Sequence, residues 1–224
     1  MSTSVLGRLI LKDFYLAWPV IAGSMVLGFA MLGLALFGGG QVTFYVGSVS
    51  FICVLILLNV FLVSSTVAQE KKDRVILFVL SLPVSTTQYA LTKLASSLLA
   101  FVIPFVMLGA AALLMIGLTA IPHGLIPLTV AVMMYVYLYF CIFLAVALAA
   151  DSAVWNTVVI ICGNVMLNFL IAWLLNRPAV GATAKGPVAV WSSEIIATLA
   201  VEFIGSVVAL AAALLAILRK KDFV

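Results

Sequence analysis

The chain has 224 residues, of which 67% are hydrophobic and only 8% are charged, and its mean hydropathy is +1.38. A soluble domain needs a far more polar surface, so this composition excludes one and indicates an integral membrane protein. The net charge is +4. The three cysteines have no metal-ligand spacing, so they predict apolar filling and no metal site.

The positions of the charged residues predict six membrane-spanning helices. Residues 14–69 and 94–150 contain no charged residue, and each stretch suits two spans because one span needs about 20 residues. Turn-forming residues divide them at Gly38–Gln41 and Ala120–Gly124. We therefore expect an all-α protein whose residues 1–224 form a single transmembrane domain with an outer loop over 176–196. The expected spans are 16–37, 43–68, 86–118, 126–149, 152–175 and 197–218.

Basic residues predict the orientation of these spans. With six spans, both termini and the 69–85 segment lie on one side of the membrane. Only Arg177 and Lys185 lie on the other side, so nine of the 11 Lys and Arg residues share the side of the termini. Short cytoplasmic loops are enriched in Lys and Arg. The termini and the 69–85 segment are therefore predicted to be cytoplasmic, and the net positive charge reports topology and no nucleic-acid partner.

The first residues of the chain allow two interpretations. Leu6, Ile10 and Phe14 share one helical face, whereas Arg8 and Lys12 share another. This pattern fits a helix lying in the membrane interface before the first span. It also fits a simple extension of the first span into water, and the periodicity does not decide between them.

A short segment between the second and third spans is too short to cross a membrane. Five charged residues, Glu70–Arg74, precede the apolar run Val75–Leu82, which Pro83 ends. Ser85 to Gln88 then form a capping-box pattern that predicts the start of the third span. The apolar run is either an interfacial helix on lipid headgroups or a docking element for another protein, with charges that set its orientation.

The run EKKDRVILFVLSLPVS (residues 70–85), followed by Lys93, resembles the segment after the second span of type-two ABC exporter permeases. LILKDFYL at 9–16 and RKKDF at 219–223 are similar to the cytoplasmic ends of that family. The resemblance implies that the short helix is a coupling helix seated on an ATPase subunit. The coupling residues would be Glu70, Lys71, Lys72, Asp73, Arg74, Val75, Ile76, Leu77, Phe78, Val79, Leu80 and Leu82.

The resemblance also implies a set of partners and a cargo. It implies ABC ATPase subunits that hold ATP and Mg, a second copy of this permease or a homologue, and the lipid bilayer of a bacterial plasma membrane. The small size is similar to permeases that export peptides such as phenol-soluble modulins. An amphipathic peptide or a lipophilic drug is therefore the expected cargo, moved outward by alternating access.

The sequence itself supports a non-catalytic subunit driven by another polypeptide. It contains no GxxxxGK[ST] phosphate loop, no GxSxG and no HExxH motif. The single histidine, His123, falls in an outer turn without a catalytic or metal-binding partner. We expect no cofactor, metal or catalytic residue in this chain. The alternative is an ATPase-independent channel or membrane scaffold, although the spans show no filter-like motif or acidic ring.

Polar residues inside spans are candidates for a transport path or a subunit interface, because burying them in hydrocarbon is costly. Glu202 is one, and a sixth span over 197–218 places it near the outer interface. Thr157, Asn164 and Asn168 lie within about 40° of one face of the fifth span. Hydrogen bonding between helices of one subunit is the alternative role for these three residues.

The two remaining connections carry weaker signals. Asp151 is expected to cap the start of the fifth span. Many members of the resembled family carry a re-entrant helical element before the last span. In this chain such an element could lie at Val188–Ser192, within an irregular stretch that contains two prolines and two glycines.

Overall fold

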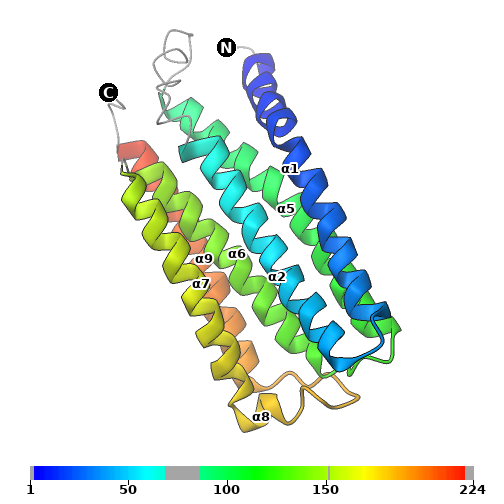
Figure 1. The fold of residues 1–224 in the computed structure, drawn as a ribbon. Helices are drawn as coiled ribbons and strands as arrows, with labels where there is room; N and C mark the ends of the chain where they lie inside the picture. The colour runs from blue at the N-terminus through cyan, green and yellow to red at the C-terminus, as the bar shows by residue number, and fades with distance from the viewer. Residues whose placement is uncertain (1–2, 69–85, 151, 220–224) are drawn as a thin grey trace.

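The computed structural model describes residues 3–68, 86–150 and 152–219, and every regular element within these ranges is helical. Six of the helices are long and apolar enough to cross a membrane. This confirms the prediction of an all-α protein with six candidate spans. Figure 1 shows them side by side in one bundle.

The long helices are connected by short segments. In chain order they are α1 (Thr3–Phe37), α2 (Gln41–Val63) with the π-helical turn η1 (Ser64–Ala68), α5 (Thr86–Leu118), α6 (Leu125–Ala149), α7 (Ala153–Leu175), the short α8 (Pro178–Gly181) and α9 (Ser193–Arg219). The start of α1, the end of η1, the start of α5 and the end of α9 all lie at one end of the bundle (Figure 1). We call this end the terminal end; α8 lies at the opposite end.

The first span and its N-terminal extension form one continuous helix. Helix α1 runs from Thr3 to Phe37 with Pro19 inside it, which agrees with an extended first span and not with a separate interfacial helix. The helix ends at the predicted glycine turn. There Gly39 has φ +73°, a left-handed conformation that glycine adopts without the steric cost of a Cβ.

Helix α6 is the central helix of the bundle. It contacts α2, α5, α7 and, most extensively, α9. Its buried face includes Val136, Phe140 and Leu144, none of them exposed. The Phe140 ring stacks on Phe101 of α5 with centroids 4.0 Å apart. Lipid chains are as apolar as these side chains, so the hydrophobic effect does not drive the helices together. Close van der Waals packing stabilises the contacts of α6 instead.

The connection between α7 and α9 differs from the expected re-entrant element. Residues 188–192 are irregular, and the helical turn is instead α8, at Pro178–Gly181. The N–H of the first residue of a helix has no partner within the helix, so a proline there costs no hydrogen bond. Pro178 therefore favours a helix start at this position. The loop then closes over the start of α6, where Gly124 N donates to Gly186 O over 3.0 Å. A Cβ on Gly124 would collide with the Thr183 carbonyl oxygen.

Serine residues set where α7 and α9 begin. The N-cap of α7 is Ser152, whose Oγ accepts from Val154 N over 3.3 Å; the expected cap, Asp151, lies outside the described residues. Helix α9 starts at Ser193 instead of the expected 197, because Ser192 Oγ accepts from Ile195 N. The earlier start places Glu202 nine residues into the helix, about 14 Å from its outer-loop end.

Candidate functional site

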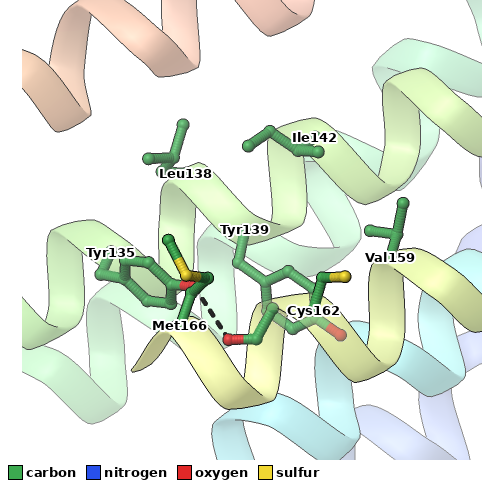
Figure 2. A pocket seen from close by; sticks show the side chains of 8 residues that line it. Tyr135, Leu138, Tyr139, Ile142, Val159, Cys162 and Met166 are labelled. Atoms are coloured by element: carbon green, nitrogen blue, oxygen red, sulfur yellow. Dashed lines mark hydrogen bonds between the residues drawn. The ribbon is translucent and has the colours of Figure 1, made fainter. Parts of the chain in front are cut away.

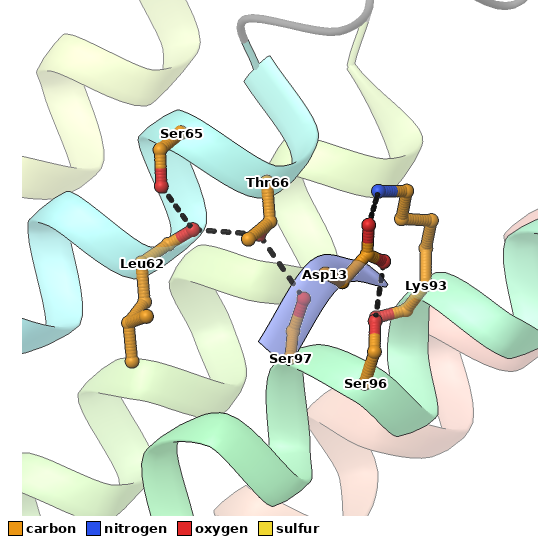
Figure 3. Close-up of polar contacts among 7 residues, drawn as sticks. All are labelled: Asp13, Leu62, Ser65, Thr66, Lys93, Ser96 and Ser97. Carbon is orange, nitrogen blue, oxygen red and sulfur yellow. Dashed lines mark hydrogen bonds and ion pairs between the residues drawn. The ribbon is translucent and has the colours of Figure 1, made fainter. Parts of the chain in front are cut away.

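Buried polar side chains are concentrated at the terminal end of the bundle. Asp13, Thr66, Lys93, Ser96 and Ser97 are all less than 9% exposed. They come from α1, η1 and α5, three elements that are far apart in the sequence. Figure 3 shows their side chains converging between these elements. We call these five residues the terminal polar network.

A buried ion pair joins α1 to α5. Lys93 Nζ lies 2.8 Å from Asp13 Oδ1, with the two side chains 5% and 6% exposed. Ser96 Oγ donates to the second carboxylate oxygen of Asp13 over 3.0 Å. Both oxygens of the carboxylate therefore have a donor, which is the condition under which a buried charge is tolerated.

A second set of contacts joins α5 to the end of α2. Thr66 Oγ1 lies 3.2 Å from Ser97 Oγ, and it also donates to Leu62 O over 2.6 Å. Ser65 Oγ contacts the same carbonyl oxygen over 3.3 Å. Serine and threonine hydroxyls compete with backbone N–H groups for carbonyls one turn earlier. This competition accounts for the widening of α2 into the π-helical turn η1, a geometry often found at functional sites.

The terminal polar network flanks the predicted coupling segment on both sides. η1 ends at Ala68 and α5 begins at Thr86, so Thr66 precedes the segment and Lys93 follows it. The predicted coupling residues, Glu70–Arg74, Val75–Leu80 and Leu82, lie outside the described residues. What the structure adds is that the flank before the segment is bonded to α5 through Thr66 and Ser97, and that α5 is bonded to α1 through Lys93 and Asp13.

Glu202, on α9, is a buried acidic residue outside the terminal polar network. It is 4% exposed, and neither carboxylate oxygen has a hydrogen-bond partner among the described residues. Its position nine residues into α9 is further from the outer-loop end than the sequence-based span over 197–218 placed it. The earlier start of α9 accounts for the difference.

The predicted polar stripe lies on α7, the helix with few buried residues. Thr157 and Asn168 are exposed, and Asn164 is half-buried. Asn164 Nδ2 donates to Ile160 O over 2.8 Å, and Asn168 Nδ2 donates to Asn164 O over 2.9 Å. Each side-chain amide therefore donates within α7, and the stripe runs along a side of the helix that is exposed at Thr157 and Asn168 and half-buried at Asn164.

An apolar pocket of about 170 Å³ separates parts of α6 and α7. Figure 2 shows Tyr135 and Tyr139 of α6 beside Cys162 and Met166 of α7. Tyr135 Oη donates to Gly163 O over 2.8 Å, so a side-chain hydroxyl of one helix is satisfied by a backbone carbonyl of the next. A Cβ on Gly163 would collide with the Tyr139 ring, which explains the glycine at this close approach.

Two buried features could not be read from the sequence. The Asp13–Lys93 pair joins residues 80 positions apart. The only sign of it in the sequence was that Asp13 directly precedes the charge-free residues 14–69 and Lys93 directly precedes residues 94–150. Asn59, on α2, is fully buried, and its side-chain oxygen and nitrogen both have no partner among the described residues. It was one polar residue within an apolar run.

The part of the chain that the structure describes holds no group of three His, Cys, Asp or Glu residues able to bind a metal ion. The residues of the terminal polar network are suited to holding helices together, because a lysine, a carboxylate and hydroxyls here satisfy one another. Its chemistry is that of a mechanical joint between α1, η1 and α5.

Residues 8–218 match the sequence model of a family described as ABC-2 family transporter protein. No curated protein matches the chain, and no solved structure matches it either. The family match covers all six candidate spans in full.

Proposed function

The chain belongs to the ABC-2 family of transporter proteins, and from this premise we propose that it is the permease of an ATP-driven exporter in a bacterial plasma membrane. Membership makes it a multi-pass membrane protein and the membrane component of an ABC transporter, a component that works with ABC ATPase subunits. The proposal adds the direction of transport, the point of coupling and the cargo. The observation that carries it is the terminal polar network, which ties the η1 flank of residues 69–85 to α5, and ties α5, the other flank, to α1.

Coupling requires a path from an ATPase to the spans. A conformational equilibrium shifts only if the driving partner interacts differently with its two states. In this proposal the ATPase contacts residues 70–82 on the cytoplasmic side, where ATP and Mg are held by that partner. A displacement of this segment pulls on η1 through Ala68 and on α5 through Thr86. The Thr66–Ser97 and Lys93–Asp13 contacts then carry it to α1.

Copurification with the ATPase tests the coupling segment. We expect Phe78→Asp and Leu80→Asp to abolish capture of the ATPase encoded beside this chain, because a charge in the apolar run opposes its docking. Val188→Asp is the control, since Val188 is exposed in the loop at the opposite end of the bundle. Equal capture by all three variants, each eluting as folded protein in detergent, would reject residues 70–82 as the docking site.

A second permease copy is proposed to cover the exposed face of α7. Asn168 and Thr157 lie there among exposed apolar residues such as Ile161 and Phe169. An asparagine facing acyl chains leaves its side-chain oxygen without a donor, which is costly in hydrocarbon. A protein partner or a water-lined path between two copies removes that cost. On this proposal Thr157, Asn164 and Asn168 line the interface or path between copies.

Disulfide crosslinking tests this arrangement. In a chain whose three cysteines are replaced by alanine, Asn168→Cys is expected to give a crosslinked dimer in membranes under mild oxidation. Phe203→Cys is the control, because Phe203 is also exposed but lies on α9. Similar yields for both variants would contradict a specific α7 interface.

The proposed cargo is an amphipathic peptide or a lipophilic drug moved outward. The spans carry few charged groups, and such a lining suits an amphiphile better than a hydrophilic solute. Inside-out vesicles with the permease and its ATPase should accumulate a lipophilic dye or an amphipathic peptide only with ATP. Flux that is independent of ATP and of the ATPase would favour the alternative of a channel or scaffold.

A further inference from the structure

Helix α9 packs on α6 through a buried face that holds one carboxyl group, that of Glu202, close to small residues. The buried face of α9 includes Ser206 and Ala213, both 1% exposed, and a Cβ on Gly205 would lie 3.1 Å from Leu138 of α6. Ser206 also makes a side-chain contact with Cys141 of α6. Glu202 lies on the same face, one turn before Ser206. A carboxyl group is therefore enclosed within the contact between α6 and α9.

Within the described ranges, the surroundings of Glu202 provide no counter-charge. Neither carboxylate oxygen has a hydrogen-bond partner among the described residues, although the residue is only 4% exposed. Tyr135 interacts electrostatically with it, but the Tyr135 hydroxyl proton is donated to Gly163 O of α7. An ionised carboxylate cannot be enclosed in this way without a large desolvation cost, whereas a protonated one can.

The other titratable groups near α9 do not stabilise an ionised Glu202. Helix α9 packs against α6, α5 and α8, and α8 has no titratable residue. Lys93 of α5 is bonded to Asp13 near the terminal end, whereas Glu202 lies about 25 Å along α9 from its terminal end. The remaining titratable residues on these helices and on α7 are Tyr89 on α5, Tyr137, Tyr139 and Cys141 on α6, Cys162 on α7, and Glu194 and Arg219 at the two ends of α9.

We propose that Glu202 is a proton-binding site, occupied by one proton while α6 and α9 are packed together and emptied to water when they separate. The packed state then binds one more proton than the separated state. Lowering the pH favours the packed state and raising the pH favours separation, by up to tenfold in the ratio of the two states per pH unit. Each opening and closing of the α6–α9 contact exchanges a proton. The proposal does not depend on which cargo or ATPase the permease uses.

Infrared spectroscopy of the full chain in lipid nanodiscs tests the occupied state. At neutral pH, the difference spectrum between wild type and Glu202→Gln is expected to contain the carbonyl stretch of a protonated carboxylic acid. Glu194→Gln is the matched control, since Glu194 is on the same helix but only half-buried near its end; its difference spectrum should contain carboxylate bands. Carboxylate bands alone in the Glu202→Gln difference would overturn the proposal.

Crosslinking between α6 and α9 tests the linkage even if the glutamine variant folds poorly. Ser206→Cys places a second thiol against native Cys141 in a chain whose Cys53 and Cys162 are replaced by alanine. We expect the disulfide yield to fall as the pH rises, and to fall equally in the Glu194→Gln background. Thiol oxidation itself accelerates as the pH rises. The reactivity of the thiols alone would therefore raise the disulfide yield, whereas separation of α6 and α9 lowers it. A yield that does not fall with rising pH while Glu202 is present would overturn the proposal.

Discussion

Among the described residues, the terminal polar network and Glu202 are the two places where this bundle buries acidic or basic side chains, and the two sites differ in how these side chains are satisfied. Asp13 has a donor on each carboxylate oxygen, from Lys93 and from Ser96. Glu202 has none among the described residues. A carboxylate enclosed with donors can stay charged and hold helices together, whereas one enclosed without donors is stable only as the neutral acid. One site is therefore a joint, and the other is suited to change its protonation when the helices move.

The largest effect is expected where the ion pair is broken from one side. Lys93→Met leaves the Asp13 carboxylate buried without its charge partner and should cost about 3–5 kcal/mol of stability. Thermal unfolding of the detergent-solubilised chain measures this. Adding Asp13→Asn to Lys93→Met removes the orphaned charge and should recover part of the loss. Lys12→Met, at an exposed neighbouring lysine, should cost far less. An equal loss in Lys12→Met would argue against the buried pair.

The next effect is expected from forcing α6 and α9 apart. Gly205→Leu overpacks the contact with Leu138 and should cost about 1–3 kcal/mol. It should also let water reach Glu202 and weaken its protonated-carboxyl infrared band at neutral pH. Gly23→Leu is the control, because a Cβ on Gly23 would meet nothing within 4 Å. Destabilisation with an unchanged carboxyl band would separate the packing of this contact from the protonation of Glu202.

A smaller effect is expected at the hydroxyl pair that joins η1 to α5. Thr66→Val keeps the shape but loses the contacts with Ser97 and Leu62 O, which should cost about 0.5–1.5 kcal/mol. Thr119→Val is matched, since Thr119 Oγ1 also donates to a carbonyl one turn earlier, Met115 O. The stability lost in Thr66→Val beyond that lost in Thr119→Val measures the contribution of the Thr66–Ser97 contact with α5. If both variants melt alike, the hydroxyl pair adds no stability to the joint.

The smallest effect is expected at Glu202 itself. Glu202→Gln resembles the neutral acid in shape and should change stability by less than about 1 kcal/mol at neutral pH. Its effect should appear in the pH dependence. Because the packed state binds the extra proton, wild-type stability contributed by this site is present at low pH and is lost as the pH rises. Unfolding temperatures measured across pH should show this loss in wild type and not in Glu202→Gln.

Prediction from the sequence succeeded where hydrophobic length and turn chemistry decide the structure. Charge-free stretches longer than a span can only form more than one helix in a bilayer, and the predicted turn residues Gly38–Gly40 lie between α1 and α2. It failed where one hydroxyl decides the outcome. Ser192 begins α9 earlier than its apolar pattern suggested, and this places Glu202 further from the outer-loop end of α9 than expected.

The sequence by itself determined that the chain is a helical membrane protein with six candidate spans, because the cost of exposing polar backbone to hydrocarbon leaves few alternatives. The sequence also determined the family, because residues 8–218 match the ABC-2 family model. Only the tertiary structure decided that Lys93 meets Asp13, that Thr66 meets Ser97 and that Glu202 meets no donor among the described residues. Those outcomes depend on which helix faces which, and helix contacts between distant residues leave no periodic signal along the chain.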